Sequence, residues 1–207
     1  MTGERTTATD EDSQIVDRFQ HGESAAFNIL FDRYQDYVYH IIYGIVGSAE
    51  EARDLTQDVF VQVYRSLPRF RKGSRFATWI YRIAVNRGVD AARASRRWRF
   101  LSILDVPALS EQMADSSDEP EAVAVQREER DAIQRILMQC PLNHRDVLVL
   151  RYYRGLSVDE IADTLGCTLS AAKVRLHRAR KIFRDACVST PGFDLSMCES
   201  DGAATDG

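Results

Sequence analysis

The sequence predicts an all-α fold made of two small helical domains, and three observations support this prediction. Apolar residues recur at intervals of three and four along most of the chain, whereas few stretches alternate with period two. Residues that favour helix caps and breaks stand at the ends of these periodic segments. A polar, acidic stretch between Ser110 and Glu121 separates two groups of helices and is expected to be a flexible linker.

The predicted organisation has five parts: a disordered tail at 1–13, a helical bundle at 14–99, a linker at 100–125, a second helical domain at 126–188 and a disordered tail at 189–207. The hydrophobic content of 44% is ordinary for globular protein, so disorder throughout is excluded. No run of 18 apolar residues exists, and the polar start lacks the apolar core of a signal peptide. We therefore expect a cytoplasmic protein without membrane insertion.

In the first domain, helical periodicity runs from about 14 to 46 and carries a wide apolar stripe, as a buried helix requires. Gly47 breaks this run, and Ser48 is suited to cap a second helix at about 49–66. Pro68 ends that helix, after which a short loop leads into a third long helix that ends near 97.

The second domain is expected to contain helices at about 121–139, 143–153, 157–165 and 169–187. Ser157 and Glu160 have the spacing of a capping box, in which each satisfies a backbone donor at the helix start. Gly166 suits the left-handed residue that ends a helix, and Thr168 can cap the next one. The last two helices therefore have the pattern of a helix-turn-helix whose second helix lies against DNA.

The basic residues are gathered in two places, although the chain as a whole has a formal net charge of −4. One group lies between 169 and 184, which contains Lys and Arg but no Asp or Glu, and the other lies between 65 and 99, where Asp90 is the single acid. Two separate basic surfaces on an acidic protein indicate two contacts with one nucleic acid.

On the last helix, a buried stripe is predicted at Ala172, Leu176, Ala179 and Phe183. Counting about 100° per residue places a second set on the opposite side, able to enter a major groove: Lys173, Val174, His177, Arg178 and Lys181. Arg175 and Arg180 fall at the flanks, where phosphate contacts are expected, and Ser170 and Ala171 lie near the helix start, where such helices usually touch base edges.

The basic helix of the first domain interleaves cationic, aromatic and amide side chains. Arg82, Asn86, Arg93 and Arg97 share one face. Cations that follow phosphates and rings that stack on bases are typical of single-strand binding, and an amide such as that of Asn86 can read an extruded base. Spacing alone leaves two roles open for Phe76 and Trp79, which are either core residues or stacking platforms.

Two runs in the first domain, Asp54-Leu-Thr-Gln-Asp-Val-Phe60 and Phe76-Ala-Thr-Trp-Ile-Tyr-Arg-Ile-Ala-Val-Asn86, closely resemble RNA polymerase sigma factors of the extracytoplasmic function (ECF) type. In the second domain, Leu148–Gly155, Leu156-Ser-Val-Asp-Glu-Ile-Ala162 and Arg175-Leu-His-Arg-Ala-Arg180 resemble the promoter-binding helix-turn-helix of that family. The resemblance covers about 14–187, and the motifs are specific when taken together and in this order.

The resemblance implies a transcription initiation factor with three surfaces. The first domain resembles region 2 of these factors, and the second resembles region 4. Region 2 would bind core RNA polymerase, at the clamp helices of its largest subunit, through Asp54, Gln57, Asp58, Val61 and Arg65. It would also bind the −10 element through Phe70, Arg71, Lys72, Ser74, Thr78, Arg82, Asn86, Arg93, Arg96 and Arg97. Region 4 would meet the polymerase flap and read the −35 element with Ser170, Ala171, Lys173, Val174, Arg175, His177, Arg178, Arg180 and Lys181. The resemblance also implies a further partner, an anti-sigma factor, which holds such a sigma factor inactive until stress releases it.

Two other hypotheses remain open from the residues. A helix-turn-helix regulator that acts without polymerase explains 143–184 but leaves the first domain unexplained. An enzyme acting on nucleic acid is disfavoured because the sequence lacks a clustered His/Asp/Glu set. No cofactor, metal or catalytic residue is predicted, and Cys140, Cys167, Cys187 and Cys198 are interpreted as reduced structural thiols rather than a zinc or redox site.

Overall fold

A computed structural model of the chain describes residues 3–71, 75–102 and 121–190. These residues form eight α-helices and one 3-10 turn, with no strand among them, which confirms the all-α prediction. The elements are α1 (Gly3–Gln20), α2 (Ala26–Val46), α3 (Ala49–Ser66), η1 (Leu67–Arg69), α4 (Phe76–Ser102), α5 (Glu121–Gln139), α6 (Leu142–Tyr152), α7 (Val158–Leu165) and α8 (Leu169–Ser189).

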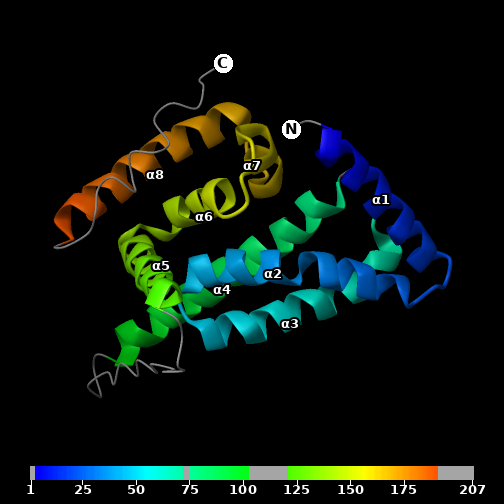
Figure 1. Cartoon of the computed structure of the whole chain (residues 1–207), viewed down its shortest axis with the longest axis horizontal. Coiled ribbons are helices and arrows are strands. Elements are labelled where there is room, and N and C mark those ends of the chain that lie inside the picture. The colour runs from blue at the N-terminus through cyan, green and yellow to red at the C-terminus, as the bar shows by residue number, and fades with distance from the viewer. Residues whose placement is uncertain (1–2, 72–74, 103–120, 191–207) are drawn as a thin grey trace.

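The N-terminal bundle consists of α1–α4 packed around α2 (Figure 1). The buried stripe of α2 includes Leu30, Val38 and Ile41, all with no exposed surface. Gly88 of α4 lets that helix approach closely, because a Cβ there would lie 3.3 Å from Ile45 Cβ. The bundle therefore encloses one well-packed apolar centre.

Local caps end α2 and begin α3 as the sequence predicts. Gly47 adopts φ 85°, in the left-handed region that favours glycine. The hydroxyl of Ser48 then accepts a hydrogen bond from the backbone N–H of Glu51. The single helical run predicted from 14 to 46 is wrong in one respect, since a turn between α1 and α2, with Gly22 at φ 100°, divides it.

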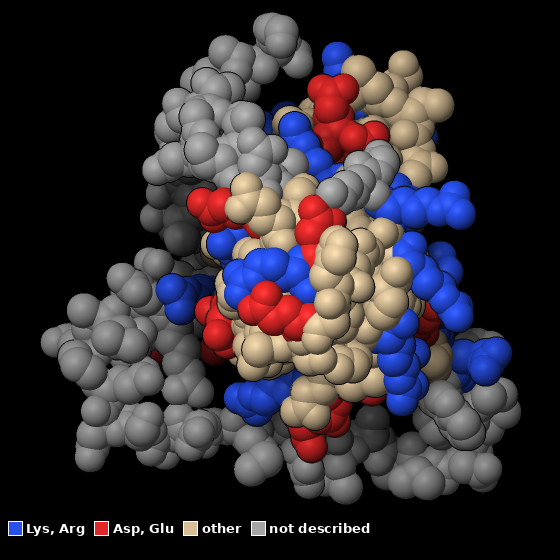
Figure 2. Space-filling view, turned by 90° about the vertical axis from the view of Figure 1, so that its right-hand side faces the viewer, with Lys and Arg blue, Asp and Glu red and all other residues tan. Residues whose placement is uncertain are grey.

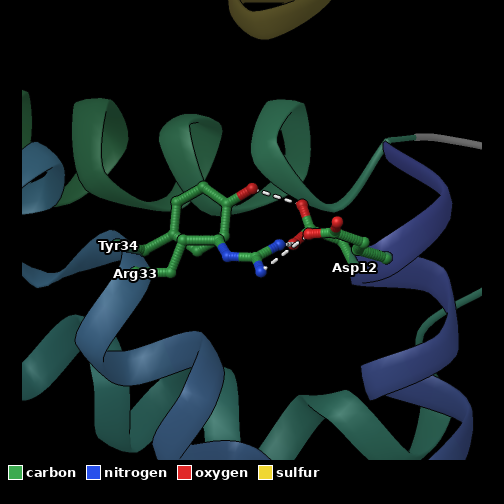
Figure 3. Close-up of polar contacts among 4 residues, drawn as sticks. Asp12, Arg33 and Tyr34 are labelled. Atoms are coloured by element: carbon green, nitrogen blue, oxygen red, sulfur yellow. Dashed lines mark hydrogen bonds and ion pairs between the residues drawn. The ribbon is translucent and has the colours of Figure 1, made fainter. Parts of the chain in front are cut away.

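The prediction of a disordered tail at 1–13 is also wrong for the described part of that segment, because α1 begins at Gly3. Asp12 is buried and accepts hydrogen bonds from two side chains of α2: the Tyr34 hydroxyl, and Arg33 Nη1 at 2.6 Å (Figure 3). Burial raises the pKa of Asp12 because it disfavours the charged carboxylate. Contacts with α2 therefore order a segment whose own composition is polar.

The C-terminal bundle consists of α5–α8. Ser157 and Glu160 form the predicted capping box of α7, Gly166 ends that helix at φ 64°, and Thr168 accepts from Ala171 N to cap α8. Helices extend into both ends of the predicted linker, to Ser102 and from Glu121, and the remainder of it lies outside the described residues. The predicted C-terminal tail lies outside them as well, apart from its first two residues.

The two bundles pack directly against each other, which the sequence did not predict. Their buried residues form one continuous apolar cluster, and α6 and α7 lie against α2 and α4 (Figure 1). Gly44 permits a close approach, since a Cβ there would lie 2.6 Å from Val149 Cγ2. Arg154 of the C-terminal bundle lies over the rings of Tyr37 and Tyr81, at 3.3 and 4.9 Å from their centroids.

Side chains of each bundle also donate hydrogen bonds to carbonyls at a helix end of the other bundle. The last carbonyls of an α-helix lack partners within the helix. Gln134 Nε2 donates to Tyr43 O at 2.9 Å and Arg145 Nη1 donates to Ile45 O at 2.6 Å, both at the end of α2. In return, Arg82 of α4 donates to Asp163 O and Thr164 O at the end of α7. The contact between the bundles is therefore polar as well as apolar.

Candidate nucleic-acid interface

The outward side of α8 forms the first candidate surface, which we name the α8 face and which consists of Lys173, Val174, His177, Arg178 and Lys181. All five are exposed, as are Ser170 and Ala171 at the helix start. Ala172, Leu176 and Ala179 are buried on the other side, as the helical spacing predicts, while Phe183 is half-buried. A helix anchored on one side and cationic on the other has the geometry of a helix that reads a major groove.

Arg175 and Arg180 differ from the α8 face because both are half-buried and contact α6. Arg175 Nη2 lies 2.5 Å from Asp146 Oδ2, and its Nε donates to Asn143 O. Arg180 Nε donates to the Tyr152 hydroxyl at 3.0 Å. The pKa of Asp146 is raised because the effect of burial exceeds the opposing effect of Arg175. These two arginines therefore brace α8 against α6, a role that sequence spacing did not suggest.

The second candidate surface is the start of α4, together with the turn before it. An aromatic corner is formed there by Phe70, Phe76 and Trp79. The ring centroid of Phe70 lies 4.8 Å from that of Trp79 and 5.9 Å from that of Phe76. Phe76 is buried and belongs to the core, whereas Trp79 and Phe70 are half-buried. The two roles left open for Phe76 and Trp79 thus separate, because only Trp79 retains exposed ring surface.

The other predicted residues of this surface lie beside the aromatic corner, further along α4, or outside the described residues. Arg71 is exposed and Thr78 is half-buried, while Lys72 and Ser74 lie outside the described residues. The basic face of α4, exposed along its length, consists of Arg82, Asn86, Arg93, Arg96 and Arg97. Figure 2 views the molecule from the side of α1. Lys and Arg side chains gather along its right-hand edge, whereas most Asp and Glu side chains lie nearer the middle of the view.

Helix α7 occupies the beginning of this basic face. Arg82 Nε donates to Thr164 O at 3.2 Å, and Arg75 Nη1 lies 3.2 Å from Glu160 Oε1. Backbone carbonyls and a carboxylate therefore stand where a phosphate backbone would be expected to bind. Asn86 and the arginines beyond it take no part in these contacts.

The third candidate surface is the α3 face, which consists of Asp54, Gln57, Asp58, Val61 and Arg65. All five are exposed, and Val59 and Val63 are buried on the opposite side. An exposed ion pair joins Asp58 to Arg87 of α4, with Asp58 Oδ2 2.5 Å from Arg87 Nη2. The structure thus brings the five predicted residues together on one side of one helix.

A groove beside the α3 face supplies residues that the sequence prediction missed. It has a volume of about 490 Å³ and is lined by Phe27, Phe31, Phe60 and Tyr64, with Gln57, Val61 and Arg65 of the α3 face beside them. Its rings pack edge to face, as between Phe31 and Phe60 at 4.7 Å. The sequence carries little signal for this groove, because Phe27 and Phe31 belong to the apolar stripe that a buried helix requires, and Phe60 and Tyr64 come from the neighbouring helix α3.

The part of the chain that the structure describes contains no cluster of three or more His, Cys, Asp or Glu residues placed to bind a metal. Of its helices, none has the length and apolar character to span a membrane. Cys140 is buried, its thiol 3.8 Å from Ile136 O, and burial raises its pKa. Cys198 lies outside the described residues.

Comparisons with solved structures agree with the fold. The chain is similar to CnrH, solved in complex with the cytosolic domain of CnrY, with a TM-score of 0.63 and 20% identity over 84% of this chain and 96% of that one. It is also similar to the sigma factor RpoE of Bartonella quintana, solved with the anti-sigma factor NepR, with a TM-score of 0.57 and 18% identity over 77% and 95% of the two chains.

Comparisons of sequence show the family. The family models for Sigma-70 region 2 and Sigma-70, region 4 match residues 30–99 and 130–182. The chain is 33% identical to the RNA polymerase sigma-H factor of Pseudomonas aeruginosa, over 83% of this chain and 91% of that protein. It is 34% identical to the ECF RNA polymerase sigma-E factor of Escherichia coli, over 82% and 91%. With both regions matched in order over the N- and C-terminal bundles, the chain belongs to the ECF RNA polymerase sigma factors.

Proposed function

We propose that this sigma factor uses its three surfaces for three different contacts in transcription initiation. The α3 face and its groove bind core RNA polymerase at the clamp helices of the largest subunit. The aromatic corner and the basic face of α4 hold the melted −10 strand, and the α8 face reads the −35 element as duplex, with region 4 also resting on the polymerase flap. The observation that carries this assignment is the occurrence of three chemically distinct exposed surfaces on one chain.

The chemistry of the α3 face supports a protein partner rather than DNA. Val61 and Tyr64 are 49% and 45% exposed and border an apolar groove. Contiguous apolar surface rimmed by polar groups marks sites of protein–protein contact. The carboxylates of Asp54 and Asp58 would repel a phosphate backbone, whereas they suit a basic helical partner.

The chemistry of α4 supports a single strand. Trp79 offers partly exposed ring surface beside Phe70, and the basic face begins one helical turn further along α4. Stacking on aromatic rings contributes about 1–3 kcal/mol per base, so captured bases favour the melted state. Asn86 is exposed within the basic face and carries both a donor and an acceptor for the edge of a flipped base.

The contact of α7 with Arg75 and Arg82 bears on this assignment. A strand that uses these two arginines for its phosphates competes with Glu160 and with the carbonyls of Asp163 and Thr164. The −10 strand therefore gains full access to α4 only when the C-terminal bundle moves away from it. Separation of the bundles would also let one chain reach two promoter elements.

Two further proposals concern partners and location. The solved relatives CnrH and RpoE of Bartonella quintana were captured with CnrY and with the anti-sigma factor NepR, so we propose an anti-sigma factor as a partner of this chain too. The protein acts in the cytoplasm, where the polymerase is found, and it acts by binding rather than as an enzyme. A helix-turn-helix regulator independent of polymerase is disfavoured because it leaves the α3 face and its groove without a role.

The test of the polymerase contact is Val61→Asp, which places a carboxylate beside the apolar groove. We expect the purified variant to lose binding to core polymerase in a fluorescence-anisotropy titration, because the charge must be desolvated in the interface. Val188→Asp is the matched control, since Val188 is 65% exposed near the end of α8, away from the α3 face. Equal core binding by both variants and the wild type would refute this role of the α3 face.

A further inference from the structure

We propose that α1 positions the two residues at the ends of the −10 loop, Phe70 and Phe76, with Gln20 as the positioning residue. The −10 loop is the segment that joins η1 to α4; Phe70 and Phe76 belong to the aromatic corner, and residues 72–74 between them lie outside the described part of the chain. Helix α1 contacts both flanking elements, η1 and α4 (Figure 1), although it precedes the region 2 match that begins at residue 30. This inference rests on the proposed function of the loop and adds a residue that acts on it from outside.

Gln20, the last residue of α1, holds the beginning of the loop. Its Nε2 donates two hydrogen bonds, to Leu67 O at 3.0 Å and to Phe70 O at 2.9 Å. Leu67 begins η1, and its carbonyl also accepts from Phe70 N at 3.1 Å, whereas Phe70 directly follows η1. One amide group therefore fixes the backbone on both sides of the turn that delivers Phe70.

A second set of contacts connects α1 with Phe76, at the other end of the loop. Asp12 accepts from the Tyr34 hydroxyl (Figure 3). The centroid of the Tyr34 ring lies 5.2 Å from that of Phe76, the first residue of α4. Tyr34 and Phe76 are both buried, so this contact fixes where α4 begins. Helix α1 thus touches the residues on either side of the loop, directly at Phe70 and through Tyr34 at Phe76.

The two hydrogen bonds of Gln20 are not required to hold α1 against the bundle. Ile15, Val16 and Phe19 are already buried against the bundle, and Asp12 is bonded to Arg33 and Tyr34. The side chain of Gln20 is exposed and lies at the rim, where it adds little apolar burial. Its measurable effect should therefore fall on Phe70 and on the ring that Phe70 contacts, Trp79.

A DNA-free experiment reads this effect through Trp79 fluorescence. Trp98, the other tryptophan of the sequence, is replaced by Phe so that Trp79 alone reports. Gln20→Met keeps the shape of the side chain but removes the donor, whereas Gln20→Lys keeps a donor. We expect stronger acrylamide quenching and a red-shifted emission for Gln20→Met, and values near wild type for Gln20→Lys. Gln14→Met, an exposed position on the same helix, is the matched control.

The functional arm uses holoenzyme reconstituted with core polymerase. The probe is a single-stranded oligonucleotide carrying the −10 non-template strand of a promoter identified from the holoenzyme's own transcripts. We expect Gln20→Met to bind it about tenfold more weakly, as two lost hydrogen bonds of ordinary net strength suggest. Binding of core polymerase and of −35 duplex should stay unchanged, and the unfolding midpoint should fall by no more than about 6 °C, since about 1.4 kcal/mol corresponds to a few degrees in a chain of this size.

The outcomes separate this inference from the proposed function. Unchanged Trp79 quenching in Gln20→Met overturns the positioning role, whatever the DNA result. A tenfold loss that Gln14→Met shares also overturns it. Failure of the wild-type holoenzyme to bind the oligonucleotide overturns the −10 assignment, and the fluorescence comparison still decides whether Gln20 orders the turn.

Discussion

Removal of Arg154 should separate the two bundles without unfolding either of them. Its guanidinium lies 3.3 Å from the ring centroid of Tyr37, and its Nη2 donates to the Tyr81 hydroxyl at 2.5 Å. A half-buried cation–π contact contributes about 1–2 kcal/mol, and a hydrogen bond from a charged donor about 1.5 kcal/mol. Arg154→Ala should therefore weaken the closed arrangement by roughly 2.5–3.5 kcal/mol, which lowers the ratio of closed to open molecules roughly 60- to 300-fold.

The assay is small-angle X-ray scattering of the free protein, combined with circular dichroism. Opening should increase the radius of gyration while the helical signal stays constant, since Arg154 contacts the N-terminal bundle and not the core of its own. Arg184→Ala is the matched control because Arg184 is an exposed arginine of α8 and carries the same charge. The reasoning is refuted if Arg154→Ala and Arg184→Ala scatter alike, or if Arg154→Ala loses helix content.

Four further outcomes are expected. Gly44→Ala should open the bundles by a steric route, because the added Cβ would lie 2.6 Å from Val149 Cγ2, and scattering should show the same expansion as above. Arg178→Ala should weaken −35 duplex binding by roughly 1–3 kcal/mol in a sequence-dependent way, whereas an equal loss on all sequences would indicate a phosphate contact. Arg175→Ala should instead lower the free energy of unfolding, by roughly 2–4 kcal/mol in urea melts, because it leaves buried Asp146 without its cation. Burial raises the pKa of Asp146 above its unfolded value, so protonation favours the folded state. The stability of wild type relative to Asp146→Asn should therefore rise as pH falls toward the ordinary carboxyl range, and a constant difference would contradict this.

The sequence predicts those parts of the fold that local chemistry determines. Helix α3 begins and ends where Ser48 and Pro68 indicate, because a cap and a proline act on their immediate neighbours. The capping box at Ser157 and the left-handed Gly166 define α7 in the same way. The exposed and buried sides of α8 follow from a spacing of about 100° per residue, so the α8 face was predictable as a surface.

The remaining features depend on contacts between residues far apart in the chain. The start of α1 is polar, and its order comes from Asp12 bonding to Arg33 and Tyr34, which no local pattern reveals. The packing of the bundles depends on pairs such as Arg82 with Thr164, separated by 82 residues. The groove beside α3 was hidden because its aromatic residues read as part of a buried stripe. Periodicity indicates which residues are apolar, but not which of them stay uncovered.

The two carboxylate oxygens of Glu160 make different contacts, one at the start of α7 and one with the other bundle. Oε2 accepts from Ser157 N at 2.9 Å and closes the capping box, while Oε1 faces Arg75 of the other bundle at 3.2 Å. Release of Arg75 therefore leaves the start of α7 fully capped. Under the proposed function, the helix-turn-helix would therefore detach with this cap intact and would meet DNA by a rigid-body movement rather than by local melting of α7.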